Sequence, residues 1–304
     1  MEILYFVLII LGLSLFETIS SIDNAIINAE ILSNMSFRAR RWFLTWGLLI
    51  AVFMVRGLLP WFIIWFSTPN IGPIEAFFAT FSKDPSIKKA IEKASPVLLI
   101  GGGTFLVFLF LHWIFMEPKN YGFSIERFFE RRNVWFYATV SVFLSVLVWF
   151  ALEHNPKMAF GAVVGSTAFF IVSGFKENAS RSERELKDKK MSDISKILYL
   201  EVIDATFSID GVLGAFAFTL SVPLILLGNG LGAFIVRELS IRNIENVKRY
   251  KYLKNGAMYS IFALGIVMIC ESYKIEVPPW FSPMITFLII GYFFLRSRRE
   301  LKAQ

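Results

Sequence analysis

Most of the chain consists of long apolar runs that are separated by short polar segments. Nine runs approach the length that crosses a bilayer as a helix, about 20 residues. They cover residues 3–30, 42–66, 95–116, 134–153, 157–175, 196–220, 221–241, 255–272 and 279–297. We therefore predict an all-α polytopic membrane protein with about nine transmembrane helices.

Two boundaries between these runs are weakly marked. The run 157–175 follows a short "EHNPK" turn, and two runs meet around Pro223 at "TLSVPL". A merger at either place would change the parity of the spans and reverse the predicted side of every later segment.

Two segments are too polar to span a membrane. Residues 70–94 predict an outside loop with short amphipathic helices, and "KENASRSERELKDKKMSD", residues 176–193, predicts a solvated connection. Neither has the composition of a separate folded unit, so we predict a single membrane domain over residues 1–304.

Composition supports the membrane class, and charge adds a topology. The 304 residues are 56% hydrophobic with a mean hydropathy of +0.59. A net charge of +7 could suit nucleic acid, but the basic residues lie between apolar runs, so we predict no nucleic-acid partner. Alternate polar segments, starting after the first run, hold 23 Lys and Arg residues, against six in the opposite set. The positive-inside rule then predicts an N-terminus outside and a C-terminus in the cytoplasm, in a bacterial-type plasma membrane.

Carboxylates inside the first run are the first sign of chemistry. In "ETISSIDNAI", Glu17 and Asp23 lie where an ionisable side chain costs several kcal/mol unless it faces protein or water. The stretch "DATFSIDGVL" aligns with this motif without a gap, so that Glu17 matches Asp204. Asp23 matches Asp210 in the same alignment.

The duplication extends into the next run of each half. "GLLIAVFMVR", ending at Arg56, aligns with "GNGLGAFIVR", ending at Arg237. Because five spans separate the copies, they would enter the membrane from opposite sides. We predict an inverted-topology repeat with copies at about 1–116 and 196–297, joined by spans at about 134–175, and a substrate site near the midplane between the copies.

Helical geometry gives these acids two faces. Glu17, Ser20 or Ser21, and Asn24 share one face of the first span. Glu201, Asp204 and Gly211 share one face of the sixth, and the later Asp of each motif lies roughly 120° away. Either the helices unwind, as their Ser and Gly residues would allow, and the four acids converge, or the two pairs have different roles.

Carboxylate, amide and hydroxyl oxygens suit a hard divalent cation with six or more oxygen ligands. The predicted metal ligands are Glu17, Asp23, Asn24, Glu201, Asp204 and Asp210. For Glu201, a solvated position near the span end fits equally well. No His or Cys lies beside these motifs, so Mn²⁺, Ca²⁺ and Mg²⁺ are favoured over Zn²⁺ and Cu⁺.

The chain resembles the TerC family of integral membrane proteins in "ETISSIDNA", "EVIDATFSIDG", the Arg after each following span and "YKYLKNGAMYSIFALGIVMI". The resemblance implies an association with tellurium resistance and, in several members, manganese efflux. The positions that match the family's acidic residues are Glu17, Asp23, Asp204 and Asp210, with Asn24 beside the first pair. The chain departs from the family at Lys254 and Asn255, where many relatives have an acidic residue or His.

These observations favour a secondary transporter, not an enzyme, that exports a divalent cation, most of all Mn²⁺, without a permanently bound cofactor. One alternative is an intramembrane aspartyl hydrolase, although no Gly-x-Gly-Asp precedes Asp210. Another is a non-transporting scaffold in metal or tellurite stress resistance.

Two motifs also have a structural interpretation. The repeated acids could neutralise Arg56 and Arg237 in buried ion pairs. The "GGGTFL" stretch from Gly101 predicts a close helix contact rather than a phosphate loop, because it lies inside an apolar run.

Overall fold

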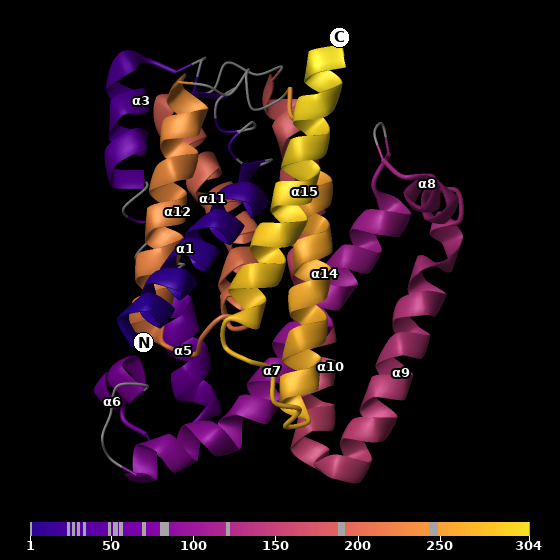
Figure 1. Ribbon diagram of the computed structural model, residues 1–304. Helices are drawn as coiled ribbons and strands as arrows, with labels where there is room; N and C mark the ends of the chain where they lie inside the picture. The colour runs from indigo at the N-terminus through magenta and orange to yellow at the C-terminus, as the bar shows by residue number, and fades with distance from the viewer. Residues whose placement is uncertain are drawn as a thin grey trace.

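The computed structural model describes residues 2–22, 25, 28, 31–32, 35–47, 50, 54, 57–68, 71–79, 85–119, 122–187, 192–242 and 249–303. These residues form helices and no strand (Figure 1). The long helices are α1 (Glu2–Ser20), α7 (Pro85–Met116), α9 (Phe136–His154), α10 (Pro156–Lys187), α11 (Asp193–Ala215), α12 (Val222–Arg242), α14 (Leu253–Ser272) and α15 (Phe281–Ala303). The shorter ones are α3 (Phe37–Trp42), the π-helix η1 (Phe43–Gly47), α5 (Leu58–Ser67), α6 (Pro73–Phe78), α8 (Ser124–Glu130) and the 3₁₀-helix η4 (Asn133–Trp135).

Five of the described helices are long and apolar enough to cross a membrane. They are Ile3–Ser20, Pro85–Met116, Asn133–His154, Pro156–Asn178 and Leu253–Ser272. The all-helical membrane class is therefore confirmed at the level of helix length and composition. The remaining predicted spans coincide with η1 and α5, α11, α12 and α15, and their crossing of the membrane stays a prediction.

The most exposed of these five helices is α9, which is apolar on its outer side. Val142 is 64% exposed and Trp149 is 66% exposed, and Val146 and Phe150 lie on the same exposed surface. An apolar surface of this extent on an outer helix suits contact with lipid chains.

Both weakly marked boundaries separate distinct helices. Asn155 is extended between α9 and α10, and its Oδ1 accepts a hydrogen bond of 3.0 Å from the backbone N–H of Lys157. Pro156 then occupies the first helical position, where a missing N–H costs nothing. Residues 216–221 form the turn between α11 and α12, so the predicted separation at Pro223 is also confirmed.

Two helices extend beyond their predicted ends. The expected outside loop 70–94 contains α6, but its last residues, from Pro85, are the first turns of α7. The expected solvated connection 176–193 is helical as far as Lys187. The physical reason for the second difference is that Glu, Arg, Lys and Ala are good helix formers even where they bury nothing.

The central helix α7 packs between α10 and α14 through glycines. A methyl group added at Gly165 would lie 2.0 Å from the carbonyl oxygen of Gly101, and one added at Gly103 would lie 2.8 Å from that of Gly265. Only hydrogen at these positions allows the backbones to approach so closely. The predicted close contact at "GGGTFL" is confirmed.

The two ends of the bundle differ in their number of basic residues. The C-terminus, α3 and α8 lie at one end, and the N-terminus and α6 lie at the other (Figure 1). Described basic residues of the first end include Arg38, Arg40, Arg41, Arg127, Arg131, Arg132, Arg249, Lys251, Arg298, Arg299 and Lys302. The basic segments that were grouped in the sequence thus share one end of the molecule.

Candidate functional site

Glu17 lies where α1 packs closely on α12. The Ser14 hydroxyl donates a hydrogen bond of 3.0 Å to the Gly228 carbonyl oxygen, and that of Thr18 donates one of 3.4 Å to Gly232. A methyl group at Gly232 would lie 2.6 Å from Glu17 Cβ. Gly228 and Gly232 are four residues apart and form one small-residue face of α12. Helix α1 packs on this face and runs parallel to α12.

The Glu17 carboxylate is completely buried between helices. Ser21 donates a hydrogen bond of 2.8 Å to Glu17 Oε1, which confirms that these two residues share a face. Glu17 Oε2 lies only 2.3 Å from where a methyl group on Gly211 of α11 would be. The carboxylate therefore occupies space that Gly211 leaves open.

Helix α11 runs antiparallel to α1 in three successive layers. Phe218, just after α11, packs on Gly12; Phe16 packs on Gly214; and Glu17 packs on Gly211. Residue numbers rise along α1 while they fall along α11. The acid layer is thus separated from the Phe218 layer by the ring of Phe16, and the two rings are 5.8 Å apart.

Asp210 lies next to the Glu17 layer and forms an ion pair with Lys176 of α10 through its Oδ2. The two side chains are 12% and 17% exposed, respectively. Glu17 and Glu117 are the carboxylates that repel the Asp210 charge. Sequence reasoning missed Lys176 because it assigned this residue to a solvated connection, whereas α10 continues through it.

Asp204 and Glu201 form a second acidic pair, one turn apart on α11. Glu201 Oε1 lies 2.3 Å from where a methyl group on Gly47 of η1 would be, and this oxygen has no hydrogen-bond partner in the structure. The Ser208 hydroxyl donates to the backbone oxygen of Asp204 at 2.5 Å, so α11 is regular here. The interruption that Ser208 and Gly211 would allow does not occur.

The structure therefore brings the described acidic residues together as two separate pairs, rather than as one set of converging acids. Glu17 neighbours Asp210, while Glu201 neighbours Asp204. Asp23 and Asn24 lie outside the described residues. Among the residues that the structure describes, no group of three His, Cys, Asp or Glu side chains could hold a metal ion. The complete ligand set stays a prediction.

Pairing with arginine does not account for Asp210, since its ion-pair partner is Lys176. Arg56 lies outside the described residues. Arg237 is partly buried, and its Nε has no hydrogen-bond partner in the structure.

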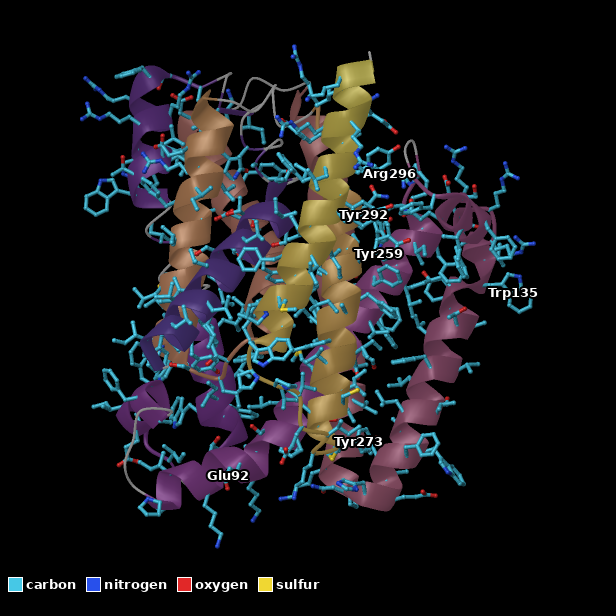
Figure 2. The ribbon with its side chains drawn as sticks, viewed as in Figure 1. Glu92, Trp135, Tyr259, Tyr273, Tyr292 and Arg296 are labelled. Atoms are coloured by element: carbon cyan, nitrogen blue, oxygen red, sulfur yellow. The ribbon has the colours of Figure 1, made fainter. Side chains whose placement is uncertain are left out.

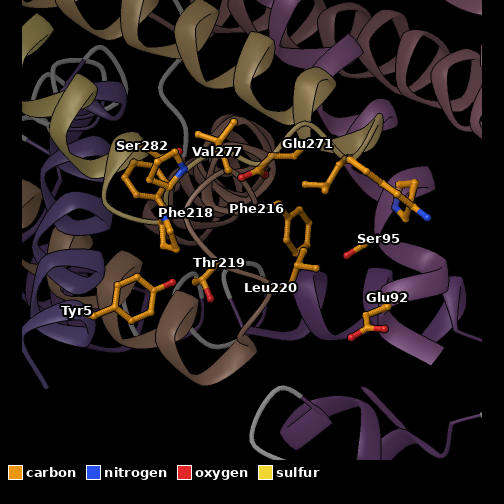
Figure 3. Close-up of a pocket in the computed structure, with 16 residues that line it drawn as sticks. Tyr5, Glu92, Ser95, Phe216, Phe218, Thr219, Leu220, Glu271, Val277 and Ser282 are labelled. Atoms are coloured by element: carbon orange, nitrogen blue, oxygen red, sulfur yellow. The ribbon is translucent and has the colours of Figure 1, made fainter. Parts of the chain in front are cut away.

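A pocket of 530 Å³ opens at the end of the bundle that contains the N-terminus (Figure 3). Glu92 of α7 and Glu271 of α14 contribute carboxylates to its wall, and Tyr5 of α1 contributes a hydroxyl. Phe218 lines the pocket and also forms the first of the three layers against α1. The rings of Phe16 and Phe218 thus lie between the pocket and the Glu17 layer.

Another buried carboxylate, Glu126 of α8, was not singled out in the sequence. It is completely buried, and its two oxygens lie 3.0 and 2.9 Å from Asn255 Nδ2. The Phe123 N–H also donates to Glu126 Oε2, at 3.1 Å. Figure 2 shows Tyr259 with Tyr292 and Arg296 at this end of the bundle. Asn255, where the chain departs from the TerC pattern, therefore ties α14 to α8.

Lys119 and Lys254 complete this end of the molecule. Lys254 Nζ lies 2.6 Å from a Glu117 carboxylate oxygen, and Lys119 donates to the Glu117 backbone oxygen at 2.9 Å. Burial lowers the pKa of Lys119 to about 8, although the Glu117 charge opposes that shift.

A family model described as a protein of unknown function (DUF475) matches residues 22–304. The match covers most of the chain, including Lys176 and Asp210, and begins just after Glu17. Comparison with curated proteins and with solved structures gives no match. The resemblance to the TerC family is not tested by these comparisons and stays a prediction.

Proposed function

Since the chain belongs to the DUF475 family, whose description states no function, we propose from the chemistry of the site that it is a secondary transporter. Its substrate is a divalent metal cation, with Mn²⁺ favoured, and it exports this ion. The observation that carries the proposal is the burial of Glu17 and Asp210 on different helices of the same neighbourhood. Glu17 belongs to a helix that is able to cross a membrane. Buried acids in such helices are expensive and characteristically serve an ion path.

Crossed contacts between the two halves support the inverted repeat. In the alignment of the two copies, Ser14 matches Glu201, and Gly47 matches Gly228. Ser14 packs on Gly228, and Glu201 packs on Gly47, so each matched contact joins opposite copies. The antiparallel course of α1 and α11 agrees with a two-fold relation between them.

The same symmetry relates the predicted ligands. If Glu17 neighbours Asp210, the matching pair is Asp204 with Asp23, and Asn24 takes the place of Gly211. We therefore propose two related half-sites rather than a single set of four converging acids. Glu201 belongs to the second half-site as a further oxygen ligand.

Orientation and energy source complete the proposal. The basic end of the bundle faces the cytoplasm, so that the N-terminus and the 530 Å³ pocket face outside. An exported cation leaves the carboxylates past Phe16 and Phe218 into that pocket. No nucleotide-binding motif is present in the sequence, so an ion gradient or the membrane potential drives export. The TerC resemblance, with its manganese efflux and tellurium resistance, supports the same function.

The test is Mn²⁺ flux into proteoliposomes that contain an internal Mn²⁺-quenched dye. Glu17→Gln and Asp210→Asn each remove one charged ligand while they preserve shape. Losing one charge-assisted contact costs about 1.5 to 3 kcal/mol, so we expect the flux to fall by about ten- to a hundredfold. Glu153→Gln, an exposed carboxylate at the end of α9, is the matched control and should keep the wild-type flux.

The proposal is contradicted if the wild-type protein folds and inserts but carries none of Mn²⁺, Ca²⁺ or Mg²⁺ under a proton gradient or a membrane potential. Unchanged flux in both acid variants would instead give Glu17 and Asp210 a structural role only.

A further inference from the structure

Lys176 is a charged residue in the apolar part of α10, and its side chain is mostly buried. It lies two residues before Asn178, the last residue of the apolar part of α10. A lysine at such a position ordinarily extends its long side chain toward the polar end of the helix. Here the side chain is only 17% exposed, and its ammonium group turns to the buried carboxylate of Asp210.

The ion pair with Lys176 involves only one of the two carboxylate oxygens of Asp210. Lys176 bonds to Oδ2, while Oδ1 is buried and has no hydrogen-bond partner in the structure. The residue as a whole is 9% exposed. A carboxylate held purely for structure is normally bonded at both oxygens, as Glu126 is by Asn255.

The surrounding charges favour a small cation. Glu17 adds negative charge near Asp210, and Lys176 is the positive group in direct contact with it, while the more distant Glu117 is paired with Lys254. The Glu17 carboxylate packs on Gly211, the residue next to Asp210, so its oxygens and Oδ1 of Asp210 belong to the same neighbourhood.

We propose that Lys176 is a tethered cation that competes with the transported ion for Asp210. This inference rests on the proposed function and concerns the regulation of the same site. Without substrate, the ammonium neutralises Asp210. When a divalent cation binds between Glu17 and Asp210, its charge repels the ammonium, which moves toward the polar end of α10, where Glu177 follows it in sequence.

Two consequences follow from this competition. Without a bound ion, Asp210 never carries an isolated charge, because Lys176 neutralises it. The empty site can therefore reorient from one side of the membrane to the other. A monovalent ion displaces Lys176 less readily than a divalent ion does, since its charge is no larger than that of the ammonium group. Lys176 therefore contributes to selectivity for divalent cations.

The experiment measures Mn²⁺ binding to the purified full-length protein through the electron paramagnetic resonance signal of free Mn²⁺. Lys176→Met removes the charge and keeps an unbranched side chain, and we expect it to lower the Kd for Mn²⁺ by about tenfold. Lys176→Arg keeps the charge and offers a two-pronged contact to the carboxylate, so we expect it to raise the Kd several-fold. Lys157→Met is the matched control, because Lys157 is an exposed lysine of the same helix, and its Kd should not change.

Flux separates competition from a purely structural ion pair. Lys176→Met should retain exchange of Mn²⁺ for Mn²⁺ across proteoliposomes but lose net export, because the empty return step lacks its counter-ion.

A Lys176→Met protein that binds Mn²⁺ no more tightly than the wild type overturns the inference, while normal export by the wild type would leave the proposed function intact. Should Lys176→Met not fold, a wild-type Kd in Lys176→Arg overturns the inference in the same way. Absence of Mn²⁺ binding in the wild type and in both variants would contradict the inference and the proposed function together.

Discussion

Glu126 and Asp210 are both buried carboxylates, but their partners give them different roles. Glu126 receives hydrogen bonds from Asn255 of α14 and from the backbone N–H of Phe123, the residue before α8, and both are neutral donors. Asp210 has one charged partner, Lys176, and one oxygen without a hydrogen bond. A carboxylate that is bonded at both oxygens fixes a fold, whereas a partly bonded one can still receive a ligand.

This contrast predicts that Asn255 matters for stability rather than transport. Asn255→Leu keeps the branched shape of the side chain and leaves Glu126 without its Nδ2 donor, which we expect to cost about 2 kcal/mol. The midpoint of thermal unfolding in detergent, followed by fluorescence-detected size exclusion, measures this loss. Lys254→Met is the control, because its ion pair with Glu117 is more than one third exposed and contributes under about 1 kcal/mol. Equal midpoints for Asn255→Leu and the wild type would show that the Glu126 network is not required.

At the level of whole helices, glycines determine which pairs of helices pack in close contact. Gly101 and Gly103 let α7 contact α10 and α14, and Gly228 and Gly232 let α12 contact α1. Transmembrane helices gain little from apolar contact alone, because lipid chains offer the same contact, so close backbone approach selects the partner. The pairings that hold Glu17 in place are therefore set by small residues on other helices.

Helix α10 offers an internal comparison of two glycines. A methyl group at Gly165 would lie 2.0 Å from the Gly101 carbonyl oxygen, while one at Gly174 meets nothing within 4 Å. We expect Gly165→Ala to destabilise the protein by about 1 to 3 kcal/mol through overpacking. Gly174→Ala should be neutral or stabilising by up to about 1 kcal/mol, because alanine is the better helix former.

The same thermal assay, applied to both variants side by side, distinguishes these effects. If Gly165→Ala melts at or above the temperature of Gly174→Ala, then α7 and α10 do not approach as closely as the structure indicates.

In the molecule as a whole, the basic residues are unevenly distributed between the two ends. Described basic residues of α3, α8 and the C-terminal part of α15 share one end, whereas the pocket and the N-terminus share the other (Figure 1). Such a division suits a protein that is inserted with its basic end in the cytoplasm. In the proposed orientation, the pocket lies on the side toward which an exporter releases its ion.

Cysteine labelling tests this orientation. In a Cys270→Ser background, Ser86→Cys introduces a thiol at the start of α7, and Lys302→Cys introduces one near the end of α15. Both positions are exposed and lie at opposite ends of the bundle. We expect a membrane-impermeant maleimide to label Ser86→Cys in intact cells and Lys302→Cys only after permeabilisation. Labelling of both positions from one side would contradict the inverted repeat, and the reverse pattern would contradict the direction of export.

Much of the helical architecture could be predicted from the order of apolar and polar residues alone. A membrane requires about 20 apolar residues per crossing and every backbone group bonded within its own helix, so each long apolar run predicts a helix. The division at Asn155 and the turn 216–221 were readable for the same reason, since Pro and small polar residues begin and end helices locally. The continuation of α10 to Lys187 was missed because charge predicts solvation but does not exclude helix.

For the site, the acidic motifs of the two halves and the Glu17 to Ser21 face follow from spacing along one helix, which the chain order encodes directly. What Asp210 contacts does not follow from spacing. Its partner Lys176 is 34 residues away, and the Glu126 contact with Asn255 joins residues 129 positions apart. Such contacts depend on how each helix is rotated and how closely it approaches its neighbours, and that is decided by packing at Gly101, Gly165, Gly211 and Gly232 across helices. The chain order therefore determined which residues could bear charge inside the membrane, and only the assembled bundle decided which opposite charge each of them meets.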